Sequence, residues 1–221
     1  MYNMYIIYIL TIVLIIVLFL TNYKIYSHFT GTTFRGLEHW KKYIKLNPDD
    51  KINYLEIGSH SGGSVIAFNK YFGNNSETKL YCMDPWTDHE DYFEYKNEMS
   101  DIYKNFKSNI KEVNLEDKVI EMKGFSHIEL HKLEDNFFDV IYIDGNHEPQ
   151  FVLEDAALSF RKLKENGYMV FDDVGWGGKN CVDKGIEGFL TGYFASIKIL
   201  SRNDSGQCFI QKITKTNHCF I

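Results

Sequence analysis

From Lys51 onward, short apolar runs alternate with longer stretches in which apolar residues recur at helical spacing. The short runs are typical of buried strands, and the longer stretches are typical of helices with one buried face. Strands that alternate with helices of this length predict βαβ units and a parallel sheet. The predicted strands are Asn53–Ile57, Lys79–Met83, Lys118–Met122, Phe138–Ile143 and Tyr168–Phe171, and the predicted helices are Gly62–Tyr71, Tyr95–Val113, Ser126–Leu133 and Pro149–Glu165.

The end of the chain departs from this alternation. After a helix predicted over Lys179–Tyr193, two apolar runs, Ser196–Leu200 and Gln207–Ile213, are separated only by Arg202–Gly206. A connection this short cannot cross over to a parallel neighbour, so we expect an antiparallel hairpin. The pattern therefore predicts an α/β fold with a mostly parallel sheet and a C-terminal antiparallel hairpin.

The first residues are apolar on every face. No charged side chain occurs in residues 1–23, and Met4–Leu20 is almost wholly apolar. Because about 20 helical residues span a bilayer core, we predict one N-terminal transmembrane anchor over residues 1–23, with tyrosines at its interfaces. A cleaved signal peptide would need a basic start and a small-residue cleavage site, and neither is present. A buried core helix is the other alternative, and a run that is apolar on all faces at the very terminus fits it poorly.

The charges that flank this segment predict its orientation. Lys24, Arg35, Lys41 and Lys42 follow the apolar run, whereas only the α-amine precedes it. The positive-inside rule then makes the chain a single-pass membrane protein with its main domain, residues 51–221, on the cytosolic side. Residues 24–50 are predicted to connect the two parts, with a helix over Phe34–Leu46 that ends at the turn Asn47–Asp50.

Charge and cysteine content narrow the choice of function. A net charge of −6 counts against a nucleic-acid-binding surface, which needs clustered lysine and arginine. The four cysteines, Cys82, Cys181, Cys208 and Cys219, form no CxxC pair, so a zinc site is unsupported. We interpret them as reduced thiols.

In open α/β sheets, ligands bind beyond the carboxyl ends of the strands, so the residues at those ends are the candidate site. The first strand ends at Glu56 and leads into the glycine loop Gly58–Gly63, which contains Ser59, His60, Ser61 and Gly62. Glycines at such a turn allow a ligand to approach backbone N–H groups closely. The spacing is GxxxGG and differs from the dinucleotide fingerprint GxGxxG. A purely structural turn is the alternative interpretation.

The next two strand ends offer further ligand contacts. The second strand ends at Asp84, whose carboxylate can accept hydrogen bonds from both hydroxyls of a ribose, or can simply shape the turn. The third is followed by Phe125 and Ser126. Phe125 can pack on a ligand ring or in the core, and Ser126 can instead cap the following helix.

The fourth and fifth strands end in carboxylates. Asp144 follows the fourth strand, and Asp172 and Asp173 follow the fifth. If these three carboxylates converge, a cation must compensate their charge, and hard oxygen ligands suit Mg²⁺ or Ca²⁺. Helix capping or solvation is the alternative. His147 lies close to Asp144 in sequence and can take a proton from a substrate hydroxyl or hydrogen-bond another group.

These motifs together resemble class I S-adenosylmethionine-dependent methyltransferases. The acidic-x-Gly-x-x-x-Gly loop resembles their motif I, Met83-Asp84-Pro85-Trp86 resembles a subgroup of small O-methyltransferases, and the DGxH and DDV elements resemble the methyltransferase 24 group, which neighbours the cephalosporin-hydroxylase-like proteins. The three acids are similar to the metal site of catechol and macrolide-sugar O-methyltransferases. The catechol type has asparagine in the position of Asp173, so this chain looks more like the sugar-modifying group. The resemblance covers about residues 51–213.

The resemblance implies a Rossmann-like, seven-stranded methyltransferase sheet and a cofactor site for S-adenosyl-L-methionine. The expected cofactor contacts are Glu56, Gly58, Ser59, His60, Ser61, Gly62, Asp84, Phe125, Ser126 and Asp144. The expected metal ligands, for Mg²⁺, are Asp144, Asp172 and Asp173, and the expected catalytic residues are His147 and Asp144. Trp86, Trp176 and Tyr92 either shape an acceptor pocket or belong to the core.

The function expected from sequence is therefore methyl transfer to a hydroxyl of a small molecule, possibly a sugar, assisted by a divalent metal. One alternative is a nicotinamide-dependent oxidoreductase, which the loop spacing, the hairpin and the three acids disfavour. The other is a non-catalytic, membrane-tethered module with the same fold. The acceptor and the oligomeric state do not follow from the sequence.

Overall fold

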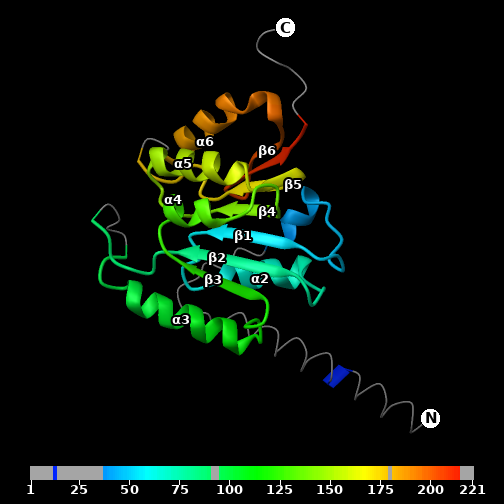
Figure 1. Cartoon of the computed structure of the whole chain (residues 1–221), viewed down its shortest axis with the longest axis vertical. Coiled ribbons are helices and arrows are strands. Elements are labelled where there is room, and N and C mark those ends of the chain that lie inside the picture. The colour runs from blue at the N-terminus through cyan, green and yellow to red at the C-terminus, as the bar shows by residue number, and fades with distance from the viewer. Residues whose placement is uncertain (1–11, 14–36, 91–94, 179–180, 215–221) are drawn as a thin grey trace, which may run out of the picture.

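The computed structural model describes residues 12–13, 37–90, 95–178 and 181–214, and the described residues from Leu37 onward form one α/β sandwich (Figure 1). Its sheet has seven strands in the order β3-β2-β1-β4-β5-β7-β6. The strands are β1 (Asn53–Ile57), β2 (Lys79–Asp84), β3 (Val119–Lys123), β4 (Phe138–Ile143), β5 (Leu163–Phe171), β6 (Ile197–Asp204) and β7 (Gln207–Lys212). The first five pair in parallel, and β7 runs antiparallel to both β5 and β6. The predicted parallel sheet with a C-terminal hairpin is confirmed.

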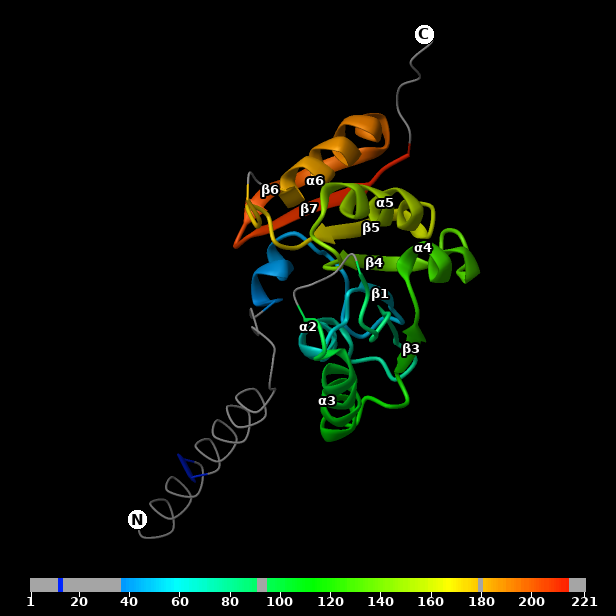
Figure 2. The same ribbon diagram turned by 90° about the vertical axis from the view of Figure 1, so that its left-hand side faces the viewer.

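Helices cover both faces of this sheet (Figure 2). The α-helices are α2 (Gly63–Phe72), α3 (Met99–Glu112), α4 (Ser126–Glu129), α5 (Pro149–Phe160) and α6 (Cys181–Gly192), and the 3-10 helices are η1 (Leu37–Lys42), η2 (Leu130–Lys132) and η3 (Phe194–Ser196). One core joins η1, α2 and α3 to the side chains of Tyr54 and Tyr142. A second core joins η2, α5 and α6 to the opposite face of the same strands.

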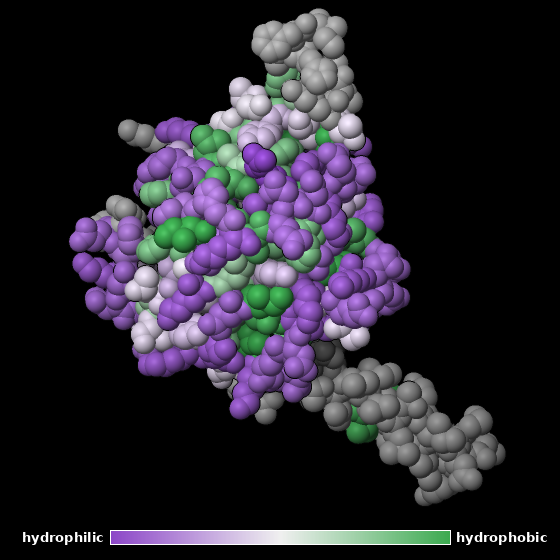
Figure 3. All heavy atoms as spheres, in the orientation of Figure 1, coloured by the Kyte–Doolittle hydropathy of each residue, from purple (hydrophilic) through white to green (hydrophobic). Residues whose placement is uncertain are grey.

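Alternation along the strands decides which core each side chain enters. In β4, Val140 and Tyr142 belong to the first core, and Ile141 and Ile143 belong to the second. Both sides of the sheet are therefore apolar, as is typical of a parallel sheet between two helical layers. The face seen in Figure 3 is mainly hydrophilic, with hydrophobic side chains in separate areas.

Two predicted boundaries are wrong where a helix meets a strand. The helix predicted to reach Glu165 ends at Phe160, and β5 begins at Leu163 rather than Tyr168. The carbonyl of Lys162 accepts the N–H groups of Phe137 and Phe138, which ties this part of the chain to the sheet. Leu163 is fully buried in the second core, so burial draws it into the strand in spite of the helical pattern.

The hairpin and the first helix also differ from the prediction. The predicted loop Arg202–Gly206 is a tight turn, because β6 continues to Asp204 and both Ser205 and Gly206 have positive φ, as a type I′ hairpin turn requires. The helix predicted over Phe34–Leu46 is the short 3-10 helix Leu37–Lys42 within the described residues, and it ends where the carbonyl of Trp40 accepts both Tyr43 N and Ile44 N.

The predicted membrane anchor, residues 1–23, lies outside the described residues apart from Ile12 and Val13, and so does the first part of the predicted connector, residues 24–36. Among the helices that the structure describes, none has both the length and the apolar character to cross a bilayer. The anchor and its cytosolic orientation stay predictions. Cys82, Cys181 and Cys208 form no disulfide among the described residues, and Cys219 lies outside the described part.

Candidate functional site

A cavity of about 510 Å³ opens at the carboxyl ends of β1, β2, β4 and β5. Of the residues predicted from sequence, it is lined by Gly58, Ser59, His60, Asp84, Phe125, Ser126, Asp144, His147, Asp172 and Asp173. The strand ends therefore meet at one cavity, as the parallel topology requires. We call the region of Gly58, Asp84, Phe125 and their neighbours the glycine-loop end. The region of Asp144, His147, Asp172 and Asp173 is the carboxylate end.

Gly58 sets the shape of the glycine-loop end. Its φ is +89°, and a Cβ atom built there would lie 1.9 Å from the carbonyl oxygen of Asp144. No side chain fits at this distance, and L-residues rarely adopt this backbone conformation. Gly58 thus lets the end of β1 pass directly against the end of β4, which brings the two ends of the cavity together.

Asp84 ties the glycine loop to β2 through main-chain hydrogen bonds. Its carboxylate accepts His60 N at 2.9 Å and Trp86 N at 2.7 Å. Burial raises the pKa of Asp84 to about 6, and the two N–H donors work against that rise. Asp84 also lines the cavity.

Three of the predicted cofactor contacts lie behind the cavity wall rather than on it. Glu56 is fully buried, and its carboxylate accepts a hydrogen bond from Ser64, which does line the cavity. Ser61 and Gly62 pack toward α3, with the carbonyl of Ser61 accepting Asn109 Nδ2 at 2.8 Å. Glu56, Ser61 and Gly62 therefore support the glycine loop from behind, and neighbouring residues of the loop line the cavity.

The buried carboxyl of Glu56 is held in its neutral form. Desolvation raises its pKa to about 8, and the negative charges of Asp84 and Asp172 add to the rise, while the Ser64 hydrogen bond opposes it. At neutral pH this group is therefore mainly a carboxylic acid.

Beside Phe125 the structure brings in a buried acid that sequence reasoning missed. Asp155 of α5 lines the cavity near Ser126, and burial raises its pKa to about 7, with the Ser126 hydrogen bond opposing the rise. Phe125 itself lies between two histidine rings, with centroids at 4.8 Å from His89 and 5.9 Å from His127. Asp155 could have been identified from the sequence by its place on the same helix face as the apolar Val152 and Ala156.

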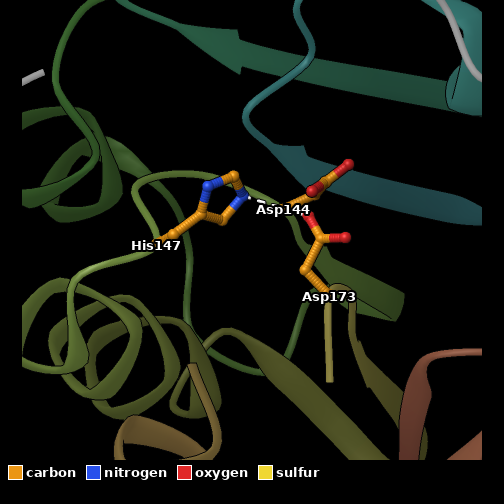
Figure 4. A group of neighbouring side chains, drawn as sticks. All are labelled: Asp144, His147 and Asp173. Atoms are coloured by element: carbon orange, nitrogen blue, oxygen red, sulfur yellow. Dashed lines mark ion pairs between the residues drawn. The ribbon is translucent and has the colours of Figure 1, made fainter. Parts of the chain in front are cut away.

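At the carboxylate end, Asp144, His147 and Asp173 form a compact group (Figure 4). One ligand atom from each residue lies within 4.8 Å of the other two. His147 Nε2 lies 3.1 Å from Asp173 Oδ2. Asp173 holds a φ of +55°, a conformation uncommon for a residue with a side chain.

Asp172 lies beside this group but takes part in a different contact. Its Oδ2 accepts the hydroxyl hydrogen of the buried Tyr142. The predicted trio Asp144, Asp172 and Asp173 thus shares one cavity wall, whereas the group with mutually close ligand atoms contains His147 in place of Asp172.

Trp86 and Trp176, for which the sequence left a pocket or a core position open, differ in exposure. Trp86 is 3% exposed and packs on Tyr103 and Phe106, so it is a core residue. Trp176 is 50% exposed, with its ring centroid 6.0 Å from that of His147. Tyr92 lies outside the described residues.

Comparison with known proteins gives the class. Residues 55–174 match the family described as "Methyltransferase domain", which covers more than half of the chain. The chain therefore belongs to this family of methyltransferase domains. The matched range runs from β1 to just past Asp173, so it contains both ends of the cavity. The nicotinamide-dependent alternative receives no support.

One similar protein is an uncharacterized protein of Acanthamoeba polyphaga mimivirus. It is 28% identical over 129 residues, which is 56% of this chain and 52% of the mimivirus protein. The chain therefore spans about half the length of this relative.

Solved structures share the fold at low sequence identity. The O-methyltransferase TomG of Streptomyces achromogenes, solved with S-adenosylmethionine, has a TM-score of 0.58 at 13% identity, over 81% of this chain and 87% of TomG. A methyltransferase of Podospora anserina, solved with S-adenosylhomocysteine, has a TM-score of 0.56 at 19% identity, over 73% and 72%. An O-methyltransferase of Bacillus cereus, also solved with S-adenosylhomocysteine, has a TM-score of 0.54 at 20% identity, over 73% and 74%.

Proposed function

We propose that this chain moves the methyl group of S-adenosylmethionine to a hydroxyl oxygen of a small, uncharged polar acceptor, with a divalent cation at the carboxylate end. The observation that carries the proposal is that the glycine-loop end and the carboxylate end share one cavity of about 510 Å³. Methyl transfer requires the cofactor and the acceptor to be held together in line, so one cavity with two different ends suits the reaction.

The charge of the cavity supports this choice of ligands. Its described lining contains five aspartates and neither lysine nor arginine: Asp84, Asp144, Asp155, Asp172 and Asp173. S-adenosylmethionine carries a sulfonium and an ammonium group, which an acidic cavity attracts. A dinucleotide pyrophosphate or an anionic acceptor would be repelled. We therefore favour a neutral acceptor such as a sugar or another polyol.

The residues at the carboxylate end fit a divalent metal. Carboxylate oxygens suit both Mg²⁺ and Mn²⁺. Asp144 and Asp173 belong both to the trio expected from sequence and to the group that the geometry assembles. A bound cation would act as a Lewis acid toward an acceptor oxygen, and two neighbouring hydroxyls would suit it best.

His147 is the base that we assign. Its Nε2 faces Asp173 at 3.1 Å, so the imidazolium formed on proton uptake would be stabilised by that carboxylate. In the reaction, the hydroxyl oxygen forms a bond to the methyl carbon and the bond from carbon to sulfur breaks. The hydroxyl proton goes to His147 Nδ1, the ring nitrogen that does not face Asp173, and S-adenosylhomocysteine leaves. An imidazole that ligates a metal through one nitrogen is a poor base at the other, so the base role requires Asp144 with Asp172 or Asp173 as ligands.

Calorimetry and transfer assays test the proposal. In calorimetry, we expect S-adenosylhomocysteine to give a measurable heat of binding and NAD to give none. We expect label from methyl-tritiated S-adenosylmethionine to appear on a member of a panel that includes hexoses, an inositol and a catechol. EDTA should stop this transfer and Mg²⁺ or Mn²⁺ should restore it. NAD binding without S-adenosylhomocysteine binding would overturn the cofactor assignment, and full activity in EDTA would overturn the metal.

Two variants with a matched control separate the roles at the carboxylate end. Asp173→Asn should lower turnover at least about 100-fold, in the range found for the loss of one positioned catalytic group, and leave the Kd for S-adenosylhomocysteine within about threefold. His147→Asn should lower turnover similarly but leave Mn²⁺ affinity unchanged if His147 is the base. Asp101→Asn, at an exposed aspartate of α3, is the control and should change neither. A loss of Mn²⁺ affinity in His147→Asn would make His147 a ligand.

A further inference from the structure

The segment Leu37–Ile44 is built into the domain. Leu37, Trp40 and Ile44 are at most 2% exposed, and they belong to the core beneath β4 and β7. The ring of Trp40 lies 5.2 Å from that of Tyr142 and 6.0 Å from that of Phe209. Leu37 also lines the cavity. This segment therefore touches the site that the strand ends form.

A chain of side-chain hydrogen bonds runs from this segment to the carboxylate end. Trp40 Nε1 donates to Gln207 Oε1 at 2.6 Å, and His39 Nε2 lies 2.8 Å from the same oxygen. Gln207 Nε2 then donates to the hydroxyl of Tyr142 at 3.2 Å. The hydroxyl of Tyr142 donates in turn to Asp172 Oδ2. The chain joins η1, β7, β4 and the end of β5.

The direction of every bond in this chain follows from its first member. An indole N–H can only donate, so the amide oxygen of Gln207 must face Trp40. The amide nitrogen then faces Tyr142, whose oxygen accepts from it and whose hydrogen points to Asp172. The indole therefore fixes a donor toward Asp172.

We propose that Trp40, Gln207 and Tyr142 are positioning residues that hold the Asp172 carboxylate in the orientation the carboxylate end requires. The inference rests on the proposed function, because the role of that end is proposed there. None of the three residues needs to touch the methyl group. Of the three, Tyr142 lines the cavity and Gln207 is 1% exposed. The segment Leu37–Ile44 is thus part of the site rather than a connector to it.

The test removes one hydrogen bond at a time. Tyr142→Phe deletes the donor to Asp172 and keeps the ring, and Gln207→Leu interrupts the chain one step earlier. Tyr43→Phe is the matched control, because it removes the 2.6 Å bond from the same segment to Asp204 at the hairpin turn and leaves the chain to Asp172 intact. Melting temperatures confirm that all three variants fold.

Two readouts that need no acceptor decide the outcome. By electron paramagnetic resonance, we expect Mn²⁺ affinity to fall about 10-fold or more in Tyr142→Phe, as for other groups that orient metal ligands, and by a smaller factor in Gln207→Leu. The Kd for S-adenosylhomocysteine should stay within about threefold, and Tyr43→Phe should match the wild type. Crystal structures of the wild type and Tyr142→Phe should show the Asp172 carboxylate rotated in the variant.

The failures of the two proposals are distinguishable. A wild-type protein that binds no Mn²⁺ overturns the metal in the proposed function, and the crystal comparison then still decides the positioning role. Unchanged orientation of Asp172 in Tyr142→Phe overturns the inference, whatever Mn²⁺ does. Equal losses in Tyr43→Phe and Tyr142→Phe also overturn it, because the effect would then come from docking of the segment.

Discussion

The two ends of the cavity are held in place by different parts of the protein. At the glycine-loop end, contacts of main-chain groups fix the geometry. Gly58 lies against the carbonyl of Asp144, and the Asp84 carboxylate accepts hydrogen bonds from two backbone N–H groups. At the carboxylate end, side chains from η1, β4 and β7 orient Asp172. The first end depends on local backbone geometry and the second on residues far apart in the chain. The two ends should therefore respond differently to substitution.

The largest effect is expected from Gly58→Ala. An alanine Cβ would lie 1.9 Å from the carbonyl oxygen of Asp144 and would need a φ that alanine rarely adopts. We expect the ends of β1 and β4 to separate and the affinity for S-adenosylhomocysteine to fall more than about 100-fold, which corresponds to about 2.7 kcal/mol, as measured by calorimetry. Gly192→Ala, at a glycine of α6 with open space around it, is the control and should bind normally. If Gly58→Ala bound S-adenosylhomocysteine with normal affinity, the claim that main-chain contacts fix the glycine-loop end would be wrong.

An intermediate effect is expected from the acid behind the glycine loop. The pKa of Glu56 is about 8 in the folded protein against an ordinary value of 4.5, so between these pH values the unfolded chain loses a proton that the folded one keeps. Stability must then fall as pH rises through that window, by at most about 1.4 kcal/mol per pH unit. Glu56→Gln removes this dependence. Urea unfolding of both proteins from pH 5 to pH 9 measures it.

The same series has a control at the surface. Glu77→Gln changes an exposed glutamate and should follow the wild-type stability curve. We expect the advantage of Glu56→Gln over the wild type to grow as pH rises and to level off above about pH 8. A constant difference between the two proteins would show that Glu56 is ionised in the folded state.

The smallest effect is expected at the rim of the carboxylate end. Trp176 is half exposed, so Trp176→Ala should change the free energy of unfolding by no more than about 0.5 kcal/mol. It should also leave the affinity for S-adenosylhomocysteine unchanged and remove the acrylamide-accessible part of the tryptophan fluorescence, because Trp40 and Trp86 are buried. A residual accessible component after this substitution would mean that one of the buried indoles becomes exposed in solution.

The same contrast explains what the sequence could predict. The bounds of β1 and β4 and the residues at the strand ends follow from apolar runs and from the rule that parallel strands end at one edge. The sequence pattern misplaced the boundary between α5 and β5, where the burial of Leu163 outweighs helical spacing. Nor could it show that Glu56 is hydrogen-bonded to Ser64, which lines the cavity, while Glu56 itself does not.

The contacts at the carboxylate end could not be predicted in this way. Trp40 and Gln207 are separated by 167 positions, and no local pattern links them. The Asp172 side chain points toward Tyr142 because of the rotamer that the packed core permits. The sequence shows that an aspartate and a tyrosine are present, and it does not show which way their side chains point. Asp155 was missed because a single acid on an apolar helix face has many structural explanations.

The place of β7 in the sheet has a consequence for biosynthesis. Among the strands that the structure describes, β7 is the last in sequence order, yet it inserts between β5 and β6 and carries Gln207. During translation, the glycine loop and its neighbouring strands can pair as they emerge, whereas Trp40 must wait for 167 further residues before it meets its amide partner. A ribosome-bound chain that stops before β7 should therefore already hold the nucleoside side of the cavity but leave Asp172 unoriented, so that the ability to bind cofactor precedes the ability to turn it over.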